Sequence, residues 1–237
     1  VLPGVRENFL LKLKAKFESM IIGDPRNPAT RLGPMINDGA VETVRHYQGL
    51  AEGEPGVQVL ARRNVAAEAA DEKIKVPALD RYADPVIYVG VRPESALAQE
   101  EIFGPVLAVI DAENLDHAIA IANDTPYGLT GGIYSQTPSH IEKAKRLVRV
   151  GNFYVNRKIT GAEVDRQPFG GYKLSGIGSK AGGIDYLLQF SRWERVDSAQ
   201  SMGASEQAAR PPSYGPRVEW KPWFYFALWL GLALFAF

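Results

Sequence analysis

The chain has 237 residues, enough for one sizeable domain with appended segments. Lysine plus arginine number 27 and aspartate plus glutamate also number 27, so charge gives no reason to expect a nucleic-acid partner. Cysteine is absent and the three histidines lie far apart without ligand-like spacing, so disulfides, thiolate chemistry and a metal site within this chain are not expected.

Helical periodicity begins at the first residues. Apolar side chains recur every four positions over Val5–Phe17, with lysines and a glutamate between them, which predicts an amphipathic helix. Residues 23–34 are rich in proline and glycine and are expected to form a loop. Asn114 suits a helix N-cap, and Thr137-Pro138 suits a cap followed by proline at the first helical position. The helices predicted on these grounds span about residues 5–20, 39–51, 115–122 and 138–150, with a short one at 185–190.

Short apolar runs between these helices predict strands. The uninterrupted run Val86–Val89 suits a strand in a sheet that is covered on both faces. Strands that alternate with helices at crossover spacing indicate an α/β domain with a mainly parallel sheet. The predicted strands span about residues 57–61, 75–78, 85–91, 106–110, 131–135 and 153–156, with a candidate edge strand at 192–196.

The composition changes after the last predicted strand. Residues 197–216 are small, polar and proline-containing, which predicts a disordered linker. Residues 217–237 contain the apolar run Pro222–Phe237, which is at the short edge of the length that spans a bilayer and predicts a hydrophobic C-terminal helix. Two tryptophans beside Lys221 resemble an interfacial belt. Three alternatives stay open for this tail: a membrane segment, a non-native end from a frameshift or fusion, or an element buried against a partner.

Three motifs resemble the signatures of the aldehyde dehydrogenase superfamily, in the order of that family. They are EEIFGPV (Glu100–Val106), NDTPYGL (Asn123–Leu129) and PFGGYKLSGIG (Pro168–Gly178). The resemblance covers about residues 1–196. GNFYVNRKITGA, RQPFGG and SKAGGIDYLLQF are similar to the branch that oxidises L-glutamate γ-semialdehyde, derived from δ-1-pyrroline-5-carboxylate, to L-glutamate in proline breakdown. The resemblance implies a partial aldehyde dehydrogenase catalytic domain, NAD as cofactor, a small-molecule substrate and a homo-oligomer.

The first motif carries the expected cofactor residues. By resemblance, Glu101 binds the nicotinamide ribose of NAD, and Phe103 lies against the nicotinamide ring. A fixed carboxylate can accept hydrogen bonds from both hydroxyls of a ribose. The alternative is that Glu100 and Glu101 are a solvated pair and that Phe103 belongs to the core.

The stretch Thr160–Gly178 carries the expected substrate residues. By resemblance, the backbone at Gly161 and Ala162 donates to the substrate α-carboxylate, and Phe169 packs on the aliphatic stem of the substrate. The alternative is an ordinary turn with a core phenylalanine. The loop glycines Gly170, Gly171, Gly176 and Gly178 are interpreted as backbone geometry and not as phosphate binders, because no strand–GxGxxG–helix context surrounds them.

The family reaction needs a cysteine thiolate that attacks the aldehyde and a glutamate that activates water. By resemblance, both lie upstream of the region that matches this chain, so we expect a C-terminal fragment of the catalytic domain, inactive in isolation. The alternative function is a non-catalytic, membrane-tethered remnant or a partner-binding protein. No signal-peptide pattern is present, so a cytoplasmic location is expected, with membrane association through the tail as the alternative.

Overall fold

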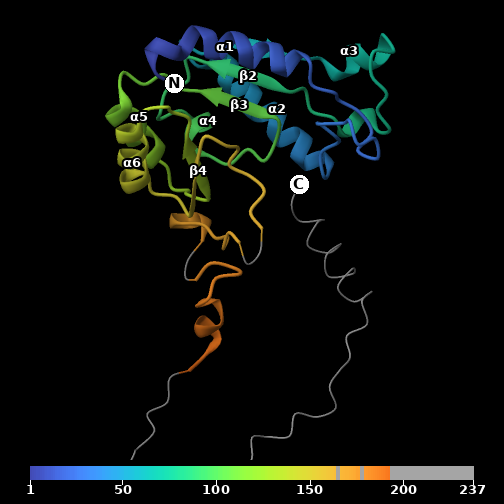
Figure 1. The fold of residues 1–237 in the computed structure, drawn as a ribbon. Coiled ribbons are helices and arrows are strands. Elements are labelled where there is room, and N and C mark those ends of the chain that lie inside the picture. Colours follow the sequence, from blue (N-terminus) through green and yellow to red (C-terminus); the bar gives the residue numbers. More distant parts are fainter. Residues whose placement is uncertain (164–165, 177–178, 193–237) are drawn as a thin grey trace, which may run out of the picture. The chain divides into compact units, whose positions relative to one another are not determined.

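The computed structural model describes residues 1–163, 166–176 and 179–192 (Figure 1). The chain divides into two compact units, residues 1–189 and 190–237, and the fold described here is that of the first. The helices are α1 Pro3–Glu18, α2 Asp38–Gly53, α3 Val65–Ala70, α4 Ala96–Gln99, α5 Leu115–Asn123 and α6 Pro138–Leu147. The strands are β1 Gln58–Arg62, β2 Val86–Val89, β3 Val106–Val109, β4 Thr130–Ile133 and β5 Asn152–Val155. Single 3₁₀ turns span Leu79–Arg81, Lys173–Ser175 and Tyr186–Phe190.

The strands form two sheets. In the first, with the order β1-β2-β3, β2 and β3 are parallel and β1 joins β2 antiparallel. In the second, β4 and β5 are parallel. The α/β class and the predominance of parallel pairing are as predicted, but the expectation of one sheet is wrong for the described residues. The connection from β1 to β2 carries only the six-residue α3, which packs on the 3₁₀ turn at Leu79–Arg81, so no helix long enough for a parallel crossover separates them.

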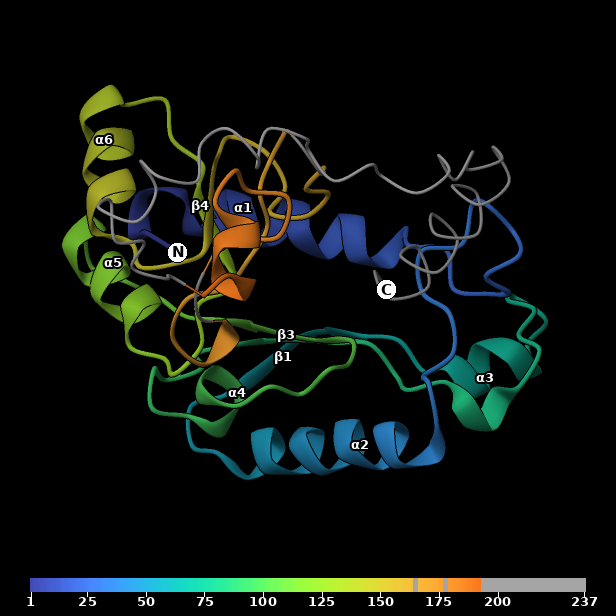
Figure 2. The same ribbon diagram turned by 90° about the horizontal axis from the view of Figure 1, so that it is seen from below.

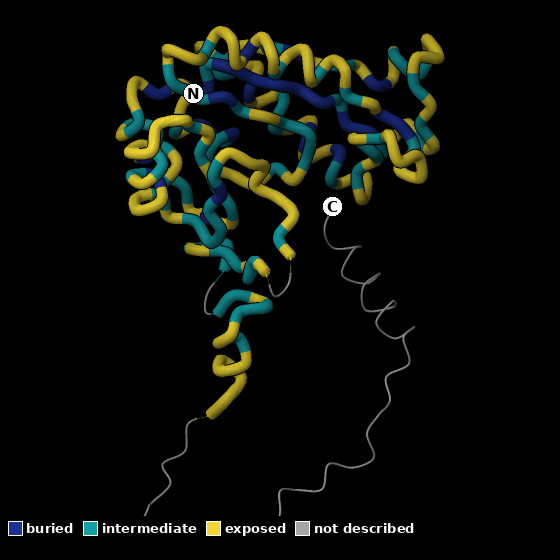
Figure 3. Tube along the Cα trace, in the orientation of Figure 1, coloured by how far each residue is buried: buried dark blue, intermediate teal, exposed yellow. Residues whose placement is uncertain are grey.

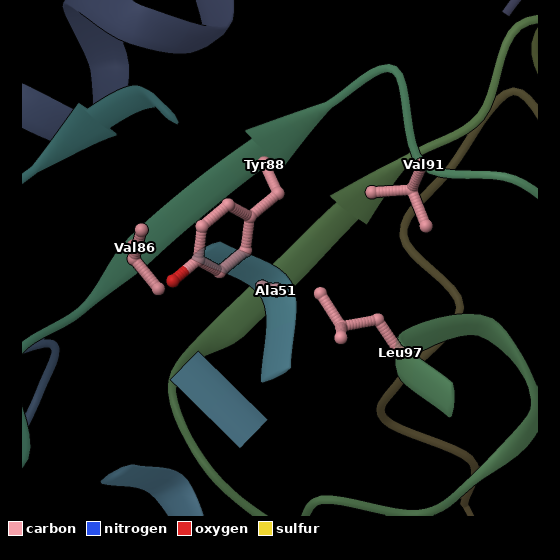
Figure 4. Close-up of a cluster of buried hydrophobic side chains, with 5 residues drawn as sticks. All are labelled: Ala51, Val86, Tyr88, Val91 and Leu97. Carbon is pink, nitrogen blue, oxygen red and sulfur yellow. The ribbon is translucent and has the colours of Figure 1, made fainter. Parts of the chain in front are cut away.

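Strand β2 lies at the centre of the larger core. Val86 and Tyr88 face α2 and α4, where they pack with Ala51 and Leu97 (Figure 4). Ile87 and Val89 face α1 and pack with Leu10. Figure 2 shows α1 and α2 on opposite sides of this sheet. All four β2 residues are buried, which confirms the prediction of a strand covered on both faces (Figure 3).

Helix α1 contacts the sheet through only part of the predicted stripe. Leu10 is buried, and Leu13 and Phe17 pack partly buried beside it, whereas Val5 and Phe9 are exposed. A helix turns 100° per residue, so a spacing of four drifts by about 40° at each step. The predicted stripe therefore winds around the helix, and only its second half stays over the sheet.

Two local predictions need correction. Residues 75–78 form no strand: Pro77 cannot donate to a strand ladder, and Ile74 and Val76 instead pack against the cluster around Ile22. The short helix α4 was not predicted; it begins where the buried Ser95 side chain accepts a hydrogen bond from the Leu97 N–H.

Helix α3 and the 3₁₀ turns at Leu79–Arg81 and Lys173–Ser175 were not predicted either. The other helices and strands, apart from the segment at 185–190, agree with prediction in place and type, within a few residues. Asn114 caps α5, since its side chain accepts from the N–H of His117. Thr137 precedes Pro138 at the start of α6 but makes no side-chain cap. The segment predicted as a short helix at 185–190 is a 3₁₀ turn.

The predictions for the C-terminal end lie outside the described residues. These are residues 193–196 of the candidate edge strand, the linker 197–216 and the hydrophobic tail 217–237. Among the helices that the structure does describe, none has the length and apolar character needed to cross a bilayer.

Candidate functional site

The segment Glu101–Phe103 links α4 to β3 and is fixed by its C-terminal neighbours. Gly104 lies against α2 so closely that a Cβ there would be 2.1 Å from Val44 Cγ2, and Pro105 O accepts from the Val86 N–H at 3.0 Å. Phe103 has a φ of +55°, which is rare for a bulky residue, and its side chain is 75% exposed. Phe103 is therefore not a core residue. Its ring is held in solvent by a strained backbone, a feature that clusters at ligand sites.

The two glutamates before Phe103 have different surroundings. The Glu100 carboxylate accepts a hydrogen bond from the Tyr47 hydroxyl of α2, and this bond raises the pKa of the Tyr47 phenol. The Glu101 side chain is exposed and has no hydrogen-bond partner within the described residues. Both side chains are exposed, but they differ: one oxygen of Glu100 is bonded to Tyr47, whereas both oxygens of Glu101 are without a partner among the described residues.

Gly161 and Ala162 follow the carboxyl ends of the parallel strands β4 and β5. Asn156, at the end of β5, ties the two strands together: its Oδ1 accepts from the Ser135 N–H and its Nδ2 donates to Ser135 O, each at 2.9 Å. Gly161 has a φ of +80°, and space beside its Cα is open, so the conformation and not crowding requires glycine. Within the described residues, the N–H groups of Gly161 and Ala162 donate to no protein acceptor.

The backbone on both sides of Phe169 is held in place. Phe169 exchanges two hydrogen bonds of 2.9 Å with Ala181, one from each N–H. The Asn152 side chain, at the start of β5, donates to Pro168 O at 2.9 Å and accepts from the Gly170 N–H at 3.3 Å. The ring itself is 39% exposed. Phe169 is thus a fixed aromatic surface that a small apolar group can contact.

The glycines of this loop serve close packing. A Cβ on Gly151 would be 1.8 Å from Gly170 O, and one on Gly171 would be 1.9 Å from Ser175 O. A Cβ on Gly176 would be 2.9 Å from Gly171 N. These contacts confirm the interpretation of the loop glycines as backbone geometry at the described positions; Gly178 lies outside them.

The three sequence motifs meet at the turn Asn123–Leu129, which follows α5. Lys173 Nζ donates to Asn123 O and Thr125 O, and Gln99 Nε2, next to the first motif, donates to Asp124 O. Gly128 O accepts from the N–H groups of Tyr172 and Gly151. Segments that are 25 to 50 residues apart in sequence are therefore joined by direct hydrogen bonds.

A separate apolar cavity of about 660 Å³ opens between α1, the loop after it and the sheet. Phe17, Met20, Leu32 and Ile87 are among its lining residues, and Gly104 and Pro105 border it. It includes none of the five residues predicted to bind cofactor or substrate. No group of three or more histidine, aspartate or glutamate side chains suited to a metal ion occurs in the part of the chain that the structure describes.

Sequence reasoning missed the residues that hold the site. Lys173 and Asn123 lie within recognised motifs, and Gln99 immediately precedes one, but no role was assigned to them. Asn152 likewise lies in a quoted segment. The one available signal was the density of motif residues around them, because hydrogen bonds between distant segments leave no periodic pattern in the sequence.

Comparison with known proteins supports one family. The aldehyde dehydrogenase family model matches residues 1–196. A 1-pyrroline-5-carboxylate dehydrogenase of Halalkalibacterium halodurans is 42% identical over 178 residues, which cover 75% of this chain and 32% of that protein. The dehydrogenase of that name from Bacillus subtilis is 39% identical over 184 residues, covering 78% and 33%. The chain thus spans about a third of the length of these relatives.

Comparison with solved structures supports the same family. Proline utilization A of Bdellovibrio bacteriovorus, inactivated by N-propargylglycine, superposes with a TM-score of 0.71 at 43% identity, over 80% of this chain and 18% of that one. A Thermus 1-pyrroline-5-carboxylate dehydrogenase with bound NAD gives 0.68 at 39% identity, over 79% and 34%. The motifs, the fold and these matches agree, and the chain belongs to the aldehyde dehydrogenase family.

Proposed function

We propose that this chain forms the substrate-binding surface and the nicotinamide-side surface of a dehydrogenase that oxidises L-glutamate γ-semialdehyde to L-glutamate. One observation carries the proposal: Gln99, which immediately precedes the first motif, and Lys173 of the third motif are hydrogen-bonded to the same turn, and each of these motifs carries an exposed aromatic ring. The similarity to 1-pyrroline-5-carboxylate dehydrogenases supports the substrate class.

The substrate groups match the groups that the chain leaves free. The semialdehyde carries an α-carboxylate on a short aliphatic stem. The N–H groups of Gly161 and Ala162, which donate to no acceptor among the described residues, are suited to the carboxylate, because successive backbone N–H groups around a left-handed residue form an anion-binding nest. The fixed ring of Phe169 is suited to the stem. Contacts with the carboxylate and with the stem would together set the position of the aldehyde carbon.

The cofactor surface fits the nicotinamide half of NAD. Glu101 has a free carboxylate for the ribose hydroxyls, and Phe103 offers an exposed ring for the nicotinamide. When bound, NAD supplies the hydride acceptor of the oxidation. Glu101 fits this role better than Glu100, because one oxygen of the Glu100 carboxylate already accepts from Tyr47.

A chimera tests the proposal. Residues 1–196 of this chain would replace the matched segment of the Halalkalibacterium halodurans relative, and NADH formation would be followed with the semialdehyde. We expect semialdehyde-dependent NADH formation. In the chimera, Phe169→Ala is expected to raise KM about tenfold, equivalent to about 1.4 kcal/mol of lost contact.

Leu174→Ala in the chimera is the matched control, since Leu174 is an apolar residue of the same loop and is 75% exposed. It should leave KM unchanged. A folded chimera that oxidises propionaldehyde as well as it oxidises the semialdehyde would contradict the substrate assignment.

A further inference from the structure

Three consecutive carbonyl groups of the turn after α5 are bound by two side chains, one from the third motif and one from the residue that immediately precedes the first motif. Lys173 Nζ lies 2.6 Å from Asn123 O and 2.7 Å from Thr125 O. Gln99 Nε2 lies 2.6 Å from the carbonyl between them, Asp124 O. The carbonyls at a helix C-terminus lack partners within the helix, so these two side chains satisfy groups that would otherwise need water.

Backbone hydrogen bonds also join the segment around Lys173 to the turn. Tyr172 donates to Gly128 O at 2.9 Å, and Leu174 donates to Pro126 O at 3.0 Å. Ser175 Oγ accepts from the Gly128 N–H at 3.0 Å. Lys173 itself has a φ of +56°, a conformation that a lysine keeps only where its surroundings require it.

The Gln99 side leads directly to the first motif. Gln99 is the last residue of α4, and its amide also donates to Pro93 O at 2.6 Å, so the amide spans the start of α4 and the turn. Glu100 and Glu101 follow it in sequence. Because Gln99 is hydrogen-bonded to the turn, a movement of the turn is expected to displace the backbone that carries Glu101 and Phe103.

The turn is anchored from a third direction. Asn123 Nδ2 donates to Leu147 O at 2.8 Å, and Asn123 Oδ1 accepts from the Arg149 N–H at 2.7 Å. Both partners lie at the end of α6. The turn is thus held in place by the end of α6, and the side chains of Gln99 and Lys173 contact it from two other segments.

We propose that Lys173 and Gln99 are positioning residues that couple the Glu101–Phe103 segment to the Phe169 loop through the turn Asn123–Gly128. Neither side chain needs to touch a ligand for this role. The identity of the two ligands rests on the proposed function, but the coupling itself is a property of the protein and is measurable without them.

Amide hydrogen exchange on the full chain tests the coupling. With Lys173→Ala, we expect exchange in residues 100–106 to accelerate at least fivefold, although the Lys173 side chain makes its hydrogen bonds to Asn123 and Thr125 and none to residues 100–106. With Gln99→Ala, we expect the same acceleration in residues 169–176. Lys158→Ala is the matched control, because Lys158 is exposed and makes no hydrogen bond or ion pair within the described residues; it should change neither segment.

A purely local effect of Lys173→Ala would contradict the proposal. If exchange accelerates only in residues 123–128 and 170–176, Lys173 stabilises only its immediate surroundings and does not couple the two segments. Gln99→Ala keeps the test decisive if the lysine variant fails to fold, because Gln99 ends a helix and its loss leaves Lys173 in place.

Binding of nicotinamide mononucleotide, followed by saturation-transfer NMR, gives a second readout. We expect Lys173→Ala to raise its Kd at least fivefold and Lys158→Ala to leave it unchanged. Equal binding by wild type and Lys173→Ala would overturn the coupling. Absence of binding by wild type would count against the proposed cofactor surface, and the exchange experiment would then decide the coupling alone.

Discussion

At the scale of single residues, the site depends on polar side chains that bind backbone. The Asn152 side chain binds the backbone of both neighbours of Phe169, and the Asn156 side chain binds the backbone N–H and C=O of Ser135. An amide side chain can donate and accept at once, which a carboxylate or an ammonium cannot. Asparagine at these positions therefore fixes loop backbone that no helix or sheet would hold.

Asn152→Ala tests this at the Phe169 loop. Two side-chain hydrogen bonds are lost, so we expect a decrease of about 2 kcal/mol in the free energy of unfolding. Urea unfolding followed by circular dichroism measures it. Asn8→Ala on the exposed face of α1 is the control and should be neutral or slightly stabilising, because alanine is the better helix former. Equal effects of the two substitutions would show that Asn152 does not hold the loop.

A second residue-scale prediction concerns pH. The Arg63 guanidinium hydrogen-bonds Glu68, with Nε 2.8 Å from Oε1, and lowers the pKa of Glu68 below its ordinary value near 4.5. A carboxyl with a lowered folded-state pKa contributes stability that is present above the unfolded value and is lost as pH falls through the folded one. The pair therefore stabilises the fold at neutral pH and not in acid.

Glu68→Gln should accordingly cost about 2 kcal/mol at pH 7, and the cost should decrease as the pH falls through the folded-state pKa of Glu68. Urea unfolding of both proteins at pH 7 and at a series of lower pH values gives the difference. Glu7→Gln is the control: Glu7 is exposed on α1 and has no ion-pair partner among the described side chains. A cost for Glu68→Gln that does not shrink in acid would show that the charge of Glu68 is not responsible.

At the scale of elements, β2 does most to define the core. Its alternate residues face opposite helices, so one short strand joins α1 to α2 and α4. Tyr88 is buried without an unpaired hydroxyl, because Arg62 donates to its oxygen at 2.9 Å. Strand β3 is less covered, with Leu107 46% exposed.

Ile87→Ala on β2 is expected to decrease the free energy of unfolding by about 3 kcal/mol, since it empties volume in a fully buried position. Leu107→Ala, which removes a comparable aliphatic side chain from the neighbouring strand, should cost less than about 1 kcal/mol. Both values come from urea unfolding under the same conditions. Similar losses at the two positions would contradict the central place of β2.

At the scale of the whole molecule, the surfaces suited to bind ligands are distinct from the reactive groups that would carry out the chemistry. The segments that carry the exposed rings of Phe103 and Phe169 are both linked to one turn, through Gln99 and Lys173. The chain contains no cysteine, so it offers no thiolate to attack an aldehyde. Positioning without a nucleophile does not replace the covalent step of the reaction.

We therefore predict that the purified chain forms no NADH from NAD and the semialdehyde above the rate without protein. Absorbance at the NADH band, followed at several chain concentrations, measures this. The chimera described above serves as the positive control. A rate proportional to the concentration of the chain alone would disprove the prediction and would require a different nucleophile.

The sequence by itself determined the family, the order of most elements and the burial of β2. These features depend on motifs and on runs of a few residues, where neighbours in the chain are neighbours in space. Asn114 as a helix cap is of the same kind, since its partner His117 is three residues away.

Only the tertiary structure decided how the motifs meet. Whether Gln99 reaches Asp124, or Lys173 reaches Asn123, depends on the path of the backbone across 25 to 50 residues. The antiparallel pairing of β1 and the face that α1 presents to the sheet are equally non-local. The sequence therefore named the residues expected to meet ligands, and the packing of distant segments decided which side chains hold them in place.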